Sequence, residues 1–416
     1  MDRLRIRGGG RLAGVVRVGG AKNAALPAMA ASILTAAPLR LRNLPEVADV
    51  HTMQHLLEHI GASCTLNGSA CEIAFEDCRS TEAPYEMVKK MRASVLVLGP
   101  LLARFRRARV SLPGGCAIGD RPINLHLEGL ARMGAQIEIE HGYVNACCDA
   151  LRGASIFFET VTVTGTENLL MAAALAEGRT ELHNCAREPE VVDLAVLLRK
   201  MGADIDGEGT ETIVVRGVRE LKAAEHDVIP DRIEAGTYIA AAAITGGDVT
   251  IERCRPDHLD AVTALLEATG AGIERGQTSI RVKGGGPLLS HDIHTAPYPH
   301  FPTDMQAQFM ALMTQATGLS IITEEIFNNR FMHVQEFCRM GADIHVAERR
   351  AVVRGPTKLS GASVMATDLR ASAGLILAAI VADGETTIDR VYHLDRGYEH
   401  MEQKLSALGA HIERIK

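Results

Sequence analysis

Hydrophobic and polar residues follow a pattern that occurs six times along the chain and predicts an amphipathic helix, a glycine and a short strand. The helix pattern is clear in residues 194–200, and the strand pattern in residues 136–139. A Gly-Ala pair separates the two, and its glycines are Gly61, Gly134, Gly202, Gly270, Gly341 and Gly409. Subtracting consecutive glycine numbers gives intervals of 73, 68, 68, 71 and 68 residues. Glycine stops a helix at little cost because it accepts the left-handed conformation. The chain is therefore one unit of roughly 70 residues used six times.

A second kind of helix, rich in alanine and almost free of charge, accompanies the amphipathic one. It is visible at residues 168–176, 236–245 and 374–382, each followed by a turn and a short strand. A helix that is apolar all round is buried, whereas an amphipathic helix is partly exposed. Each unit is therefore expected to contain helix, strand, helix and two strands, with buried helices inside a shell of sheets and outer helices.

The length of 416 residues predicts two domains of three units each, because one compact core of that size is uncommon. Strand patterns flank both chain ends, at residues 4–6 and 411–415. If a strand from the first residues completes the last unit, one domain spans residues 22–229 and the other combines residues 1–21 with 230–416. The chain would then cross twice between domains, which suits closure on a ligand.

Composition narrows the class of protein. The hydrophobic share of 47% and the charged share of 23% are typical of a globular protein, and the apolar runs are too short to cross a bilayer. The N-terminus lacks an apolar signal segment, so we expect a cytoplasmic protein without a membrane partner. A net charge of −7 argues against a general nucleic-acid binder. Nine cysteines without a CxxC motif favour reduced thiols, and Cys185, Cys254 and Cys338 are expected to be shielded.

Polar residues at the starts of the apolar helices are the first candidates for chemistry. Lys22, Arg92 and Arg370 stand where the helix dipole disfavours cations, which indicates a bound anion. Taken singly, such a residue is usually just solvated, so the recurrence carries the argument. The segments that begin at Asp231 and Thr303 fit capping boxes.

A Gly/Pro-rich loop at residues 112–126 replaces the short connection found in the other units. Long loops on rigid scaffolds often carry active-site groups. Cys116 lies among its glycines, with Arg121 nearby. An isolated cysteine is more often a small buried hydrophobe, but the absence of an apolar pattern favours a functional role here. A thiol with an ordinary pKa of about 8.5 is largely protonated at neutral pH and can donate a proton.

Several ordered motifs make the chain similar, over its whole length, to the UDP-N-acetylglucosamine enolpyruvyl transferase family. They lie at residues 20–27, 113–119, 230–234, 301–306, 325–333, 368–372 and 395–398. The resemblance implies an α/β fold of two domains, each an inside-out α/β barrel with three copies of a βαβαββ unit. It implies transfer of the enolpyruvyl group of phosphoenolpyruvate to the 3′-hydroxyl of UDP-N-acetylglucosamine, with release of phosphate. This is the first committed step of peptidoglycan synthesis. The family needs no metal or other cofactor, and it is inhibited covalently by fosfomycin, here at Cys116.

The resemblance also implies roles for individual residues. Lys22, Arg121 and Arg396 hold the phosphate and carboxylate of phosphoenolpyruvate. Cys116 delivers a proton to the methylene carbon, and Asp304 takes the proton of the attacking hydroxyl. Closure of the domains keeps water from the oxocarbenium-like centre between these two steps.

The remaining site residues follow from the same motifs. Asp368 and Arg370 support the site near the developing charge, and Asp304 also contacts the UDP-sugar. The other implied substrate contacts are Asn23, Arg92, Pro122, Ile123, Asn124, Leu125, Thr160, Thr162, Ile326 and Arg330. Thr160 stands where some members have a lysine near the nucleotide, which leaves that contact open.

Two rival functions remain at this point. An enzyme like 5-enolpyruvylshikimate-3-phosphate synthase has the same repeats and donor, but the Cys116 loop and the Lys22-Asn23 pair favour the nucleotide-sugar enzyme. A non-catalytic repeat scaffold would have interchangeable units, whereas the second unit has its own loop and the helix starts differ in charge.

Overall fold

The computed structural model describes residues 2–112 and 123–416 of the chain. Cys116, Arg121 and Pro122 lie outside the described residues. The described residues form two compact units. One, the Lys22 unit, contains residues 20–112 and 123–229, and the other, the Asp304 unit, contains residues 2–19 and 230–416.

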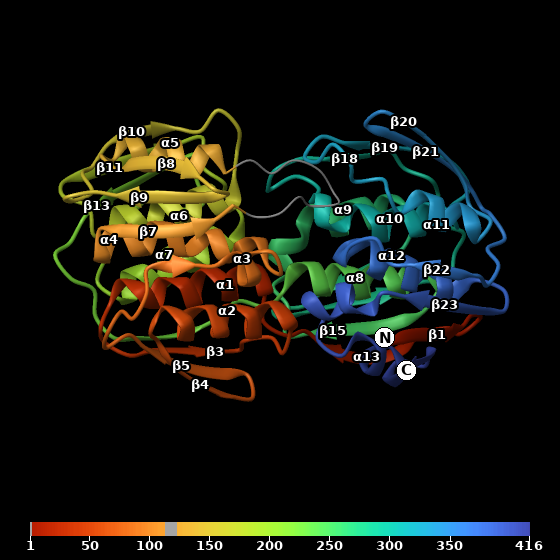
Figure 1. Ribbon diagram of the computed structural model, residues 1–416. Helices are drawn as coiled ribbons and strands as arrows, with labels where there is room; N and C mark the ends of the chain where they lie inside the picture. Colours follow the sequence, from red (N-terminus) through yellow and green to blue (C-terminus); the bar gives the residue numbers. More distant parts are fainter. Residues whose placement is uncertain (1, 113–122) are drawn as a thin grey trace. The chain divides into compact units, whose positions relative to one another are not determined.

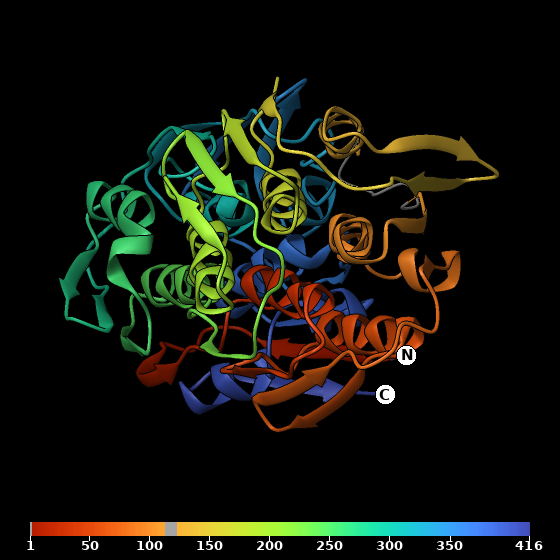
Figure 2. The ribbon, with the colours of Figure 1, turned by 90° about the vertical axis from the view of Figure 1, so that its left-hand side faces the viewer.

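The Lys22 unit holds three four-stranded sheets, one for each sequence repeat (Figure 1). The first repeat has, in sheet order, β14 (Ala224–Asp227), β3 (Leu39–Arg42), β5 (Ala70–Ala74) and β4 (Ser63–Asn67), with α1 (Lys22–Ala31) and α2 (Ala48–Ile60). The second has β6 (Glu82–Ala83), β7 (Arg107–Ser111), β9 (Tyr143–Cys147) and β8 (Gln136–Glu140), with α3 (Tyr85–Val88), η2 (Arg92–Val97), α4 (Leu98–Phe105) and α5 (Asn124–Arg132). The third has β10 (Ser155–Phe157), β11 (Arg179–His183), β13 (Thr212–Arg216) and β12 (Asp204–Asp206), with α6 (Val163–Ala174) and α7 (Pro189–Lys200). Figure 2 shows the β8–β9 hairpin projecting from the rest of this unit.

The Asp304 unit also holds three four-stranded sheets. The first repeat has β2 (Ala13–Arg17), β15 (Asp248–Glu252), β17 (Ser279–Lys283) and β16 (Gly272–Arg275), with α8 (Arg232–Ile244) and α9 (Asp260–Ala268). The second has β18 (Ile293–Thr295), β19 (Gly318–Glu324), β21 (Arg350–Gly355) and β20 (Asp343–Ala347), with η4 (Thr303–Met305), α10 (Gln306–Met313) and α11 (Val334–Arg339). The third has β22 (Ser363–Met365), β23 (Glu385–Asp389), β1 (Arg3–Arg7) and β24 (His411–Ile415), with α12 (Leu369–Val381), η5 (Val391–Arg396) and α13 (Met401–Ala407).

All six sheets share one topology. The first two strands run parallel and the other two complete the sheet antiparallel, as in β18, β19, β21 and β20. The apolar helix joins the two parallel strands directly in four of the sheets, whereas β14–β3 and β2–β15 pair strands that are far apart in the chain. The chain start supplies two strands, because β1 pairs with β23 and β24 and β2 pairs with β15. A strand from the first residues therefore does complete the last repeat, as the sequence analysis expected.

The glycines that end the amphipathic helices have the predicted conformation. Their φ angles are 134° at Gly61, 96° at Gly134, 106° at Gly202, 95° at Gly270, 94° at Gly341 and 102° at Gly409. Side chains rarely adopt this region, so glycine is the residue that allows each helix to stop and the next strand to begin.

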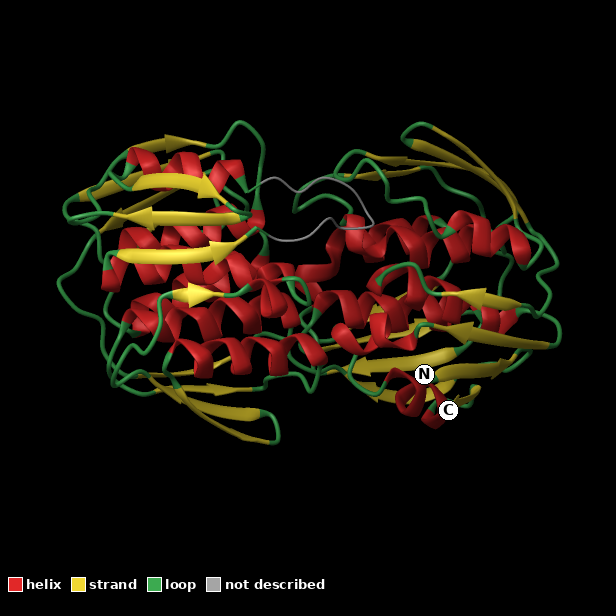
Figure 3. Ribbon diagram, in the orientation of Figure 1, coloured by secondary structure: helices red, strands yellow, loops and turns green. Residues whose placement is uncertain are grey.

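The apolar helices are buried, as their composition predicts. Every residue of α10 is buried, and α8, α10 and α12 contact one another inside the Asp304 unit. In the Lys22 unit α6 contacts both α1 and α4. Figure 3 shows helices enclosed by strands within each unit, and each unit has its own hydrophobic core. The predicted inside-out arrangement, with sheets outside and apolar helices inside, is the one observed.

One helix start differs from the expectation. Arg92 begins the 3₁₀ turn η2, and the α-helix α4 begins only at Leu98. Pro100 lacks an N–H group, and the N–H of Gly99 donates to Asn168 Oδ1 at 2.7 Å, so neither can extend an α-helical pattern backwards. Across the described residues, no helix combines the length and hydropathy needed to cross a membrane.

Candidate active site

Asp304 lies between two arginines in the Asp304 unit. Its Oδ1 is 3.0 Å from Arg330 Nη2, and its Oδ2 is 3.0 Å from Arg370 Nη2 and 3.1 Å from Arg370 Nε. Both arginine side chains are 4% exposed. Burial opposes the charge of Arg370, but Asp304, Tyr398 and Asp231 together outweigh it and raise the pKa of Arg370. Arg370 Nη1 is buried with no hydrogen-bond partner in the described part of the chain, so it has a donor to offer a ligand.

Glu324, fully buried at the end of β19, connects this cluster to the next loop. Its Oε2 accepts from Thr303 Oγ1 at 2.9 Å. Its Oε1 accepts from the backbone N–H groups of Ile326 at 2.9 Å and Phe327 at 3.1 Å. One carboxylate thus fixes two segments that the resemblance assigns to the UDP-sugar. Sequence reasoning missed Glu324, whose only signal is an acidic residue closing an apolar strand.

The capping box predicted at Thr303 is wrong. Pro302 is the N-cap residue of η4, and no side chain caps it. The Thr303 hydroxyl is engaged by Glu324 instead. The capping box predicted at Asp231 is confirmed in one of its two parts, because Asp231 caps α8 by accepting from the N–H groups of Ile233 and Glu234. The Glu234 side chain does not complete the box, and it accepts from Gly19 N and Lys404 Nζ instead.

Asp368 and Arg396 lie close to the same cluster. Asp368 caps α12 by accepting from the N–H groups of Arg370 at 2.9 Å and Ala371 at 3.1 Å. Burial and Arg396 lower the pKa of His393, while Asp368 raises it, so both residues lie within electrostatic reach of that ring. The Asp304 unit therefore brings together Asp304, Arg330, Arg370 and Asp368, and Ile326 joins them through Glu324. Arg396 ends η5, an element that contacts α12.

Lys22 is the first residue of α1 and is buried in the Lys22 unit. Its Nζ lies 3.1 Å from Asp49 Oδ2, and the two side chains are 10% and 4% exposed. Asp49, in the first turn of α2, balances part of the charge that the sequence analysis assigned to a bound anion. Asn23 follows on α1 and is half-buried. The sequence offered no signal that would select Asp49 among the acidic residues.

A buried hydrogen-bond network lies within electrostatic reach of Arg92. Burial, assisted by Arg92, lowers the pKa of His126 to about 4, so the imidazole is neutral. Asn168 Nδ2 donates to Val95 O at 3.0 Å and to His126 Nδ1 at 3.0 Å. His126 Nε2 then carries the proton and faces Thr164 Oγ1 at 3.4 Å.

This network gathers three of the segments assigned to the UDP-sugar. His126 belongs to α5, which Ile123 precedes and Asn124 and Leu125 begin. Thr162 caps α6 by accepting from Gly165 N at 3.2 Å, and Thr160 is exposed two residues earlier. The starts of η2, α5 and α6 therefore lie near one another, with Arg92 as their cation.

The described cysteines are free thiols. Burial raises the pKa of Cys185 to about 12 and of Cys254 to about 11, so both are shielded as predicted. The expectation for Cys338 is wrong: it is exposed, because it lies on the solvent side of α11. Cys147 is exposed as well. No group of three or more His, Cys, Asp or Glu side chains suited to a metal ion occurs among residues 2–112 and 123–416.

Each unit thus presents buried cations beside carboxylates. Such a site can neutralise an anionic substrate, and a carboxylate held in one orientation between arginines is positioned to accept a proton from it.

Comparison with known proteins gives one consistent family. The model of the EPSP synthase (3-phosphoshikimate 1-carboxyvinyltransferase) family matches residues 6–405. The chain is 59% identical to a UDP-N-acetylglucosamine 1-carboxyvinyltransferase of Koribacter versatilis, covering 100% of this chain and 97% of the relative. A protein of the same name from Solibacter usitatus is 56% identical, with both chains fully covered.

Two solved structures show the same fold. The enolpyruvyl transferase NikO from Streptomyces tendae matches with a TM-score of 0.91 and 27% identity, over 99% of this chain and 98% of that one. EPSP synthase from Acinetobacter baumannii matches with a TM-score of 0.77 and 20% identity over the full length of both chains, which supports the fold alone. The predicted two-domain α/β fold is confirmed.

Proposed function

This chain belongs to the EPSP synthase (3-phosphoshikimate 1-carboxyvinyltransferase) family, and we propose that within it the chain acts on UDP-N-acetylglucosamine. It transfers the enolpyruvyl group of phosphoenolpyruvate to the 3′-hydroxyl of that sugar nucleotide and releases phosphate. The full-length identity of 55–59% to relatives named for this reaction is the observation that carries the proposal. The product serves peptidoglycan synthesis.

The reaction proceeds by addition and elimination. Cys116 protonates the methylene carbon of phosphoenolpyruvate, and the 3′-hydroxyl attacks the adjacent carbon while Asp304 takes its proton. Loss of a proton from the methyl group and departure of phosphate then restore the double bond. Arg330 and Arg370 hold the Asp304 carboxylate in one orientation, which positions it to take that proton.

The charged substrate groups are assigned to cations of both units. Lys22, Arg121 and Arg396 receive the phosphate and carboxylate of phosphoenolpyruvate, with Asn23 beside them. Arg370 supports the developing charge, which agrees with its Nη1 donor having no hydrogen-bond partner within the described chain. Asp368 orients Arg370 by capping its backbone.

The UDP-sugar is assigned to the two clusters described above. Arg92, the start of α5 and the start of α6 supply the contacts of the Lys22 unit, and Thr160 replaces the lysine of some relatives there. Ile326, Arg330 and Asp304 supply those of the Asp304 unit. The hydrogen bonds of Glu324 support this assignment, because they hold the Asp304 and Ile326 segments in one arrangement before substrate arrives.

Phosphate release tests this function against its nearest rival. Purified protein is incubated with phosphoenolpyruvate and UDP-N-acetylglucosamine, with phosphoenolpyruvate and shikimate 3-phosphate, or with phosphoenolpyruvate alone. We expect phosphate only in the first mixture, with the enolpyruvyl sugar nucleotide identified by mass spectrometry. Release with shikimate 3-phosphate would instead favour the reaction for which the family model is named.

Fosfomycin provides a second test, directed at Cys116. The epoxide should alkylate this thiol much faster than Cys147 or Cys338, although both of those are exposed. Exposure alone would label all three, whereas a thiol in a cationic site reacts selectively. Peptide mapping after short incubation measures the three rates. A label mainly on Cys147 or Cys338, or inactivation that persists in Cys116→Ser, would contradict the assignment of Cys116 as the reactive thiol.

A further inference from the structure

A cavity of the Lys22 unit has not been assigned a part in the reaction described above. It has a volume of about 790 Å³, within the range of cavities that bind small molecules. It opens at one end of the sheet β6-β7-β9-β8, where β7 and β8 begin and β9 ends. None of the substrate-assigned residues that the structure describes lines it.

Four arginines that line this cavity have no side-chain partner among the described residues. Arg79, Arg106, Arg107 and Arg152 are exposed, and none of their guanidinium groups forms a hydrogen bond or ion pair within the described chain. On the same strand as Arg107, Arg109 is by contrast satisfied, since it pairs with Glu82 at 2.8 Å and lies over the Tyr143 ring.

The charge of the lining is strongly one-sided. Among the described lining residues, Asp149 is the acidic one, against the four arginines. Unpaired cations around a concave protein surface focus the electrostatic field and raise the local concentration of anions. The planar guanidinium group also matches phosphate oxygens in a two-point contact.

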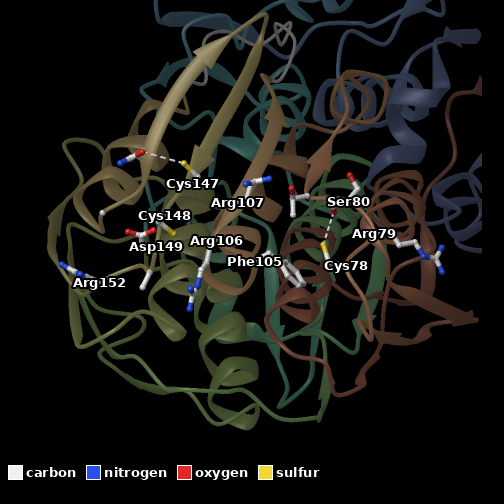
Figure 4. A pocket seen from close by; sticks show the side chains of 14 residues that line it. Cys78, Arg79, Ser80, Phe105, Arg106, Arg107, Cys147, Cys148, Asp149 and Arg152 are labelled. Carbon is white, nitrogen blue, oxygen red and sulfur yellow. Dashed lines mark hydrogen bonds between the residues drawn. The ribbon is translucent and has the colours of Figure 1, made fainter.

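The positions of the arginines indicate what kind of anion would fit. In Figure 4 Arg152 and Arg79 stand at opposite ends of the cavity, with Arg106 and Arg107 between them. A chain of phosphates extends along such a row of cations and carries more charge than one phosphate ion, so it matches this lining better. We propose that the cavity binds a small molecule carrying several phosphate groups, at a site separate from the substrate contacts.

Cys147 makes the proposal testable without an activity assay. It is exposed in the cavity lining, whereas Cys78 and Cys148 are partly buried and burial raises the pKa of both. N-ethylmaleimide, which is uncharged, would label Cys147, and a bound polyphosphate would shield it. Cys338, exposed in the other unit, serves as an internal reference.

The experiment compares labelling rates by peptide mapping of the full chain. With inorganic tripolyphosphate near saturation, Cys147 should react about fivefold more slowly, as expected for about 80% occupancy. Cys338 should be unaffected, and orthophosphate at the same concentration should protect much less. Added salt should weaken the protection, because the attraction is electrostatic.

Two variants locate the binding site. The double variant Arg106→Ala/Arg107→Ala should lose the protection, while Arg219→Ala, which changes an exposed arginine of the same unit outside the cavity, should retain it. Thermal unfolding confirms that both variants are folded. Equal protection in the double variant, equal slowing at Cys338, or no protection at any concentration would each overturn the proposal. Because no turnover is measured, these outcomes do not depend on the function proposed above.

Discussion

Asp304 balances two buried guanidinium groups, so its side chain supports the local structure as well as the proposed chemistry. Replacing it with alanine leaves Arg330 and Arg370 without their shared partner, which should destabilise the fold by about 3 kcal/mol. Asparagine keeps the size and one acceptor, so Asp304→Asn should destabilise less. Neither variant has a carboxylate to accept a proton, and both should lose nearly all turnover.

Urea unfolding and phosphate release measured on both variants separate the two roles. The variants should differ in stability and agree in their loss of activity. Substantial turnover in Asp304→Asn would contradict the role of a base and leave Asp304 with a purely structural one.

His126 should make the stability of the protein depend on pH. Burial and Arg92 lower its folded pKa to about 4, against 6.5 in the unfolded chain. Between these values the unfolded state binds more protons, so stability rises with pH and its full contribution is present above about pH 6.5. Acidification from pH 7 to pH 5 should therefore cost on the order of 2 kcal/mol from this group alone.

The measurement is urea unfolding of the wild type, His126→Asn and His141→Asn at both pH values. His333 contributes in the same direction in all three proteins, since burial lowers its pKa to about 4 as well. The His126 variant should show a smaller pH dependence than the wild type, while the exposed His141 serves as the control and should change nothing. An equal pH dependence in all three proteins would show that His126 is not the group responsible.

At Gly202, which follows α7, the end of the helix depends on backbone conformation rather than on contacts with neighbouring atoms. A β-carbon added at Gly202 would meet no atom within 4 Å, so the φ angle of 106° is the sole obstacle to substitution there. Gly202→Ala should destabilise by about 1–2 kcal/mol through this strain.

Gly286 is the matched control, because it also has open space around it but no left-handed φ angle. Gly286→Ala should be neutral or slightly stabilising, since alanine restricts the unfolded chain. Thermal unfolding of the two variants checks the comparison, and equal effects would mean that conformation does not decide the outcome.

Glu324 joins two elements, η4 and the loop after β19. It should therefore affect the binding of the UDP-sugar and not the binding of phosphoenolpyruvate. Glu324→Ala removes three hydrogen bonds at once and should raise the KM for UDP-N-acetylglucosamine at least about tenfold, corresponding to roughly 1.4 kcal/mol. Glu324→Gln keeps an oxygen that can accept from the N–H groups of Ile326 and Phe327, so its KM for UDP-N-acetylglucosamine should rise less than that of Glu324→Ala.

The control is Glu325→Gln, which changes the exposed neighbour. A role in positioning predicts that the KM for phosphoenolpyruvate stays nearly unchanged while that for the sugar nucleotide rises. Equal changes in both constants, or a parallel loss in Glu325→Gln, would indicate general destabilisation instead.

At the level of the whole molecule, the proposed reaction assigns residues of both units to one pair of substrates. Within the described residues the chain passes between the units twice, after Gly19 and after Ile229. We predict that UDP-N-acetylglucosamine reduces the radius of gyration measured by small-angle scattering and protects the Cys116 loop from proteolysis. Phosphoenolpyruvate alone is the control. An unchanged radius together with unchanged proteolysis would refute closure on the sugar nucleotide.

Much of the architecture could be predicted from the sequence because its causes are local. A glycine with positive φ ends a helix, and a helix without charged residues is buried, in whichever repeat it occurs. The repeats, the helix ends and the buried helices could therefore be recognised from the sequence. The motifs at Lys22, Asp304 and Arg370 were recognisable for a similar reason: each is a short run of fixed residue types. Cys116 and Arg121 lie outside the described residues, so their roles stay predictions from the sequence.

The partners of these residues were decided by the tertiary structure. Asp304 and Arg370 are 66 positions apart, Lys22 and Asp49 are 27 apart, and nothing in the sequence pattern selects either pair. The sequence predicts Thr303 as a helix cap, but packing brings Glu324 within reach of its hydroxyl. It also predicts a shielded Cys338, but the face of α11 that carries this residue is the exposed one. The sequence by itself determined which backbone conformations and helices each repeat adopts. Which side chains pair across repeats depends on how those helices pack, because a buried charge takes the partner that packing brings to it.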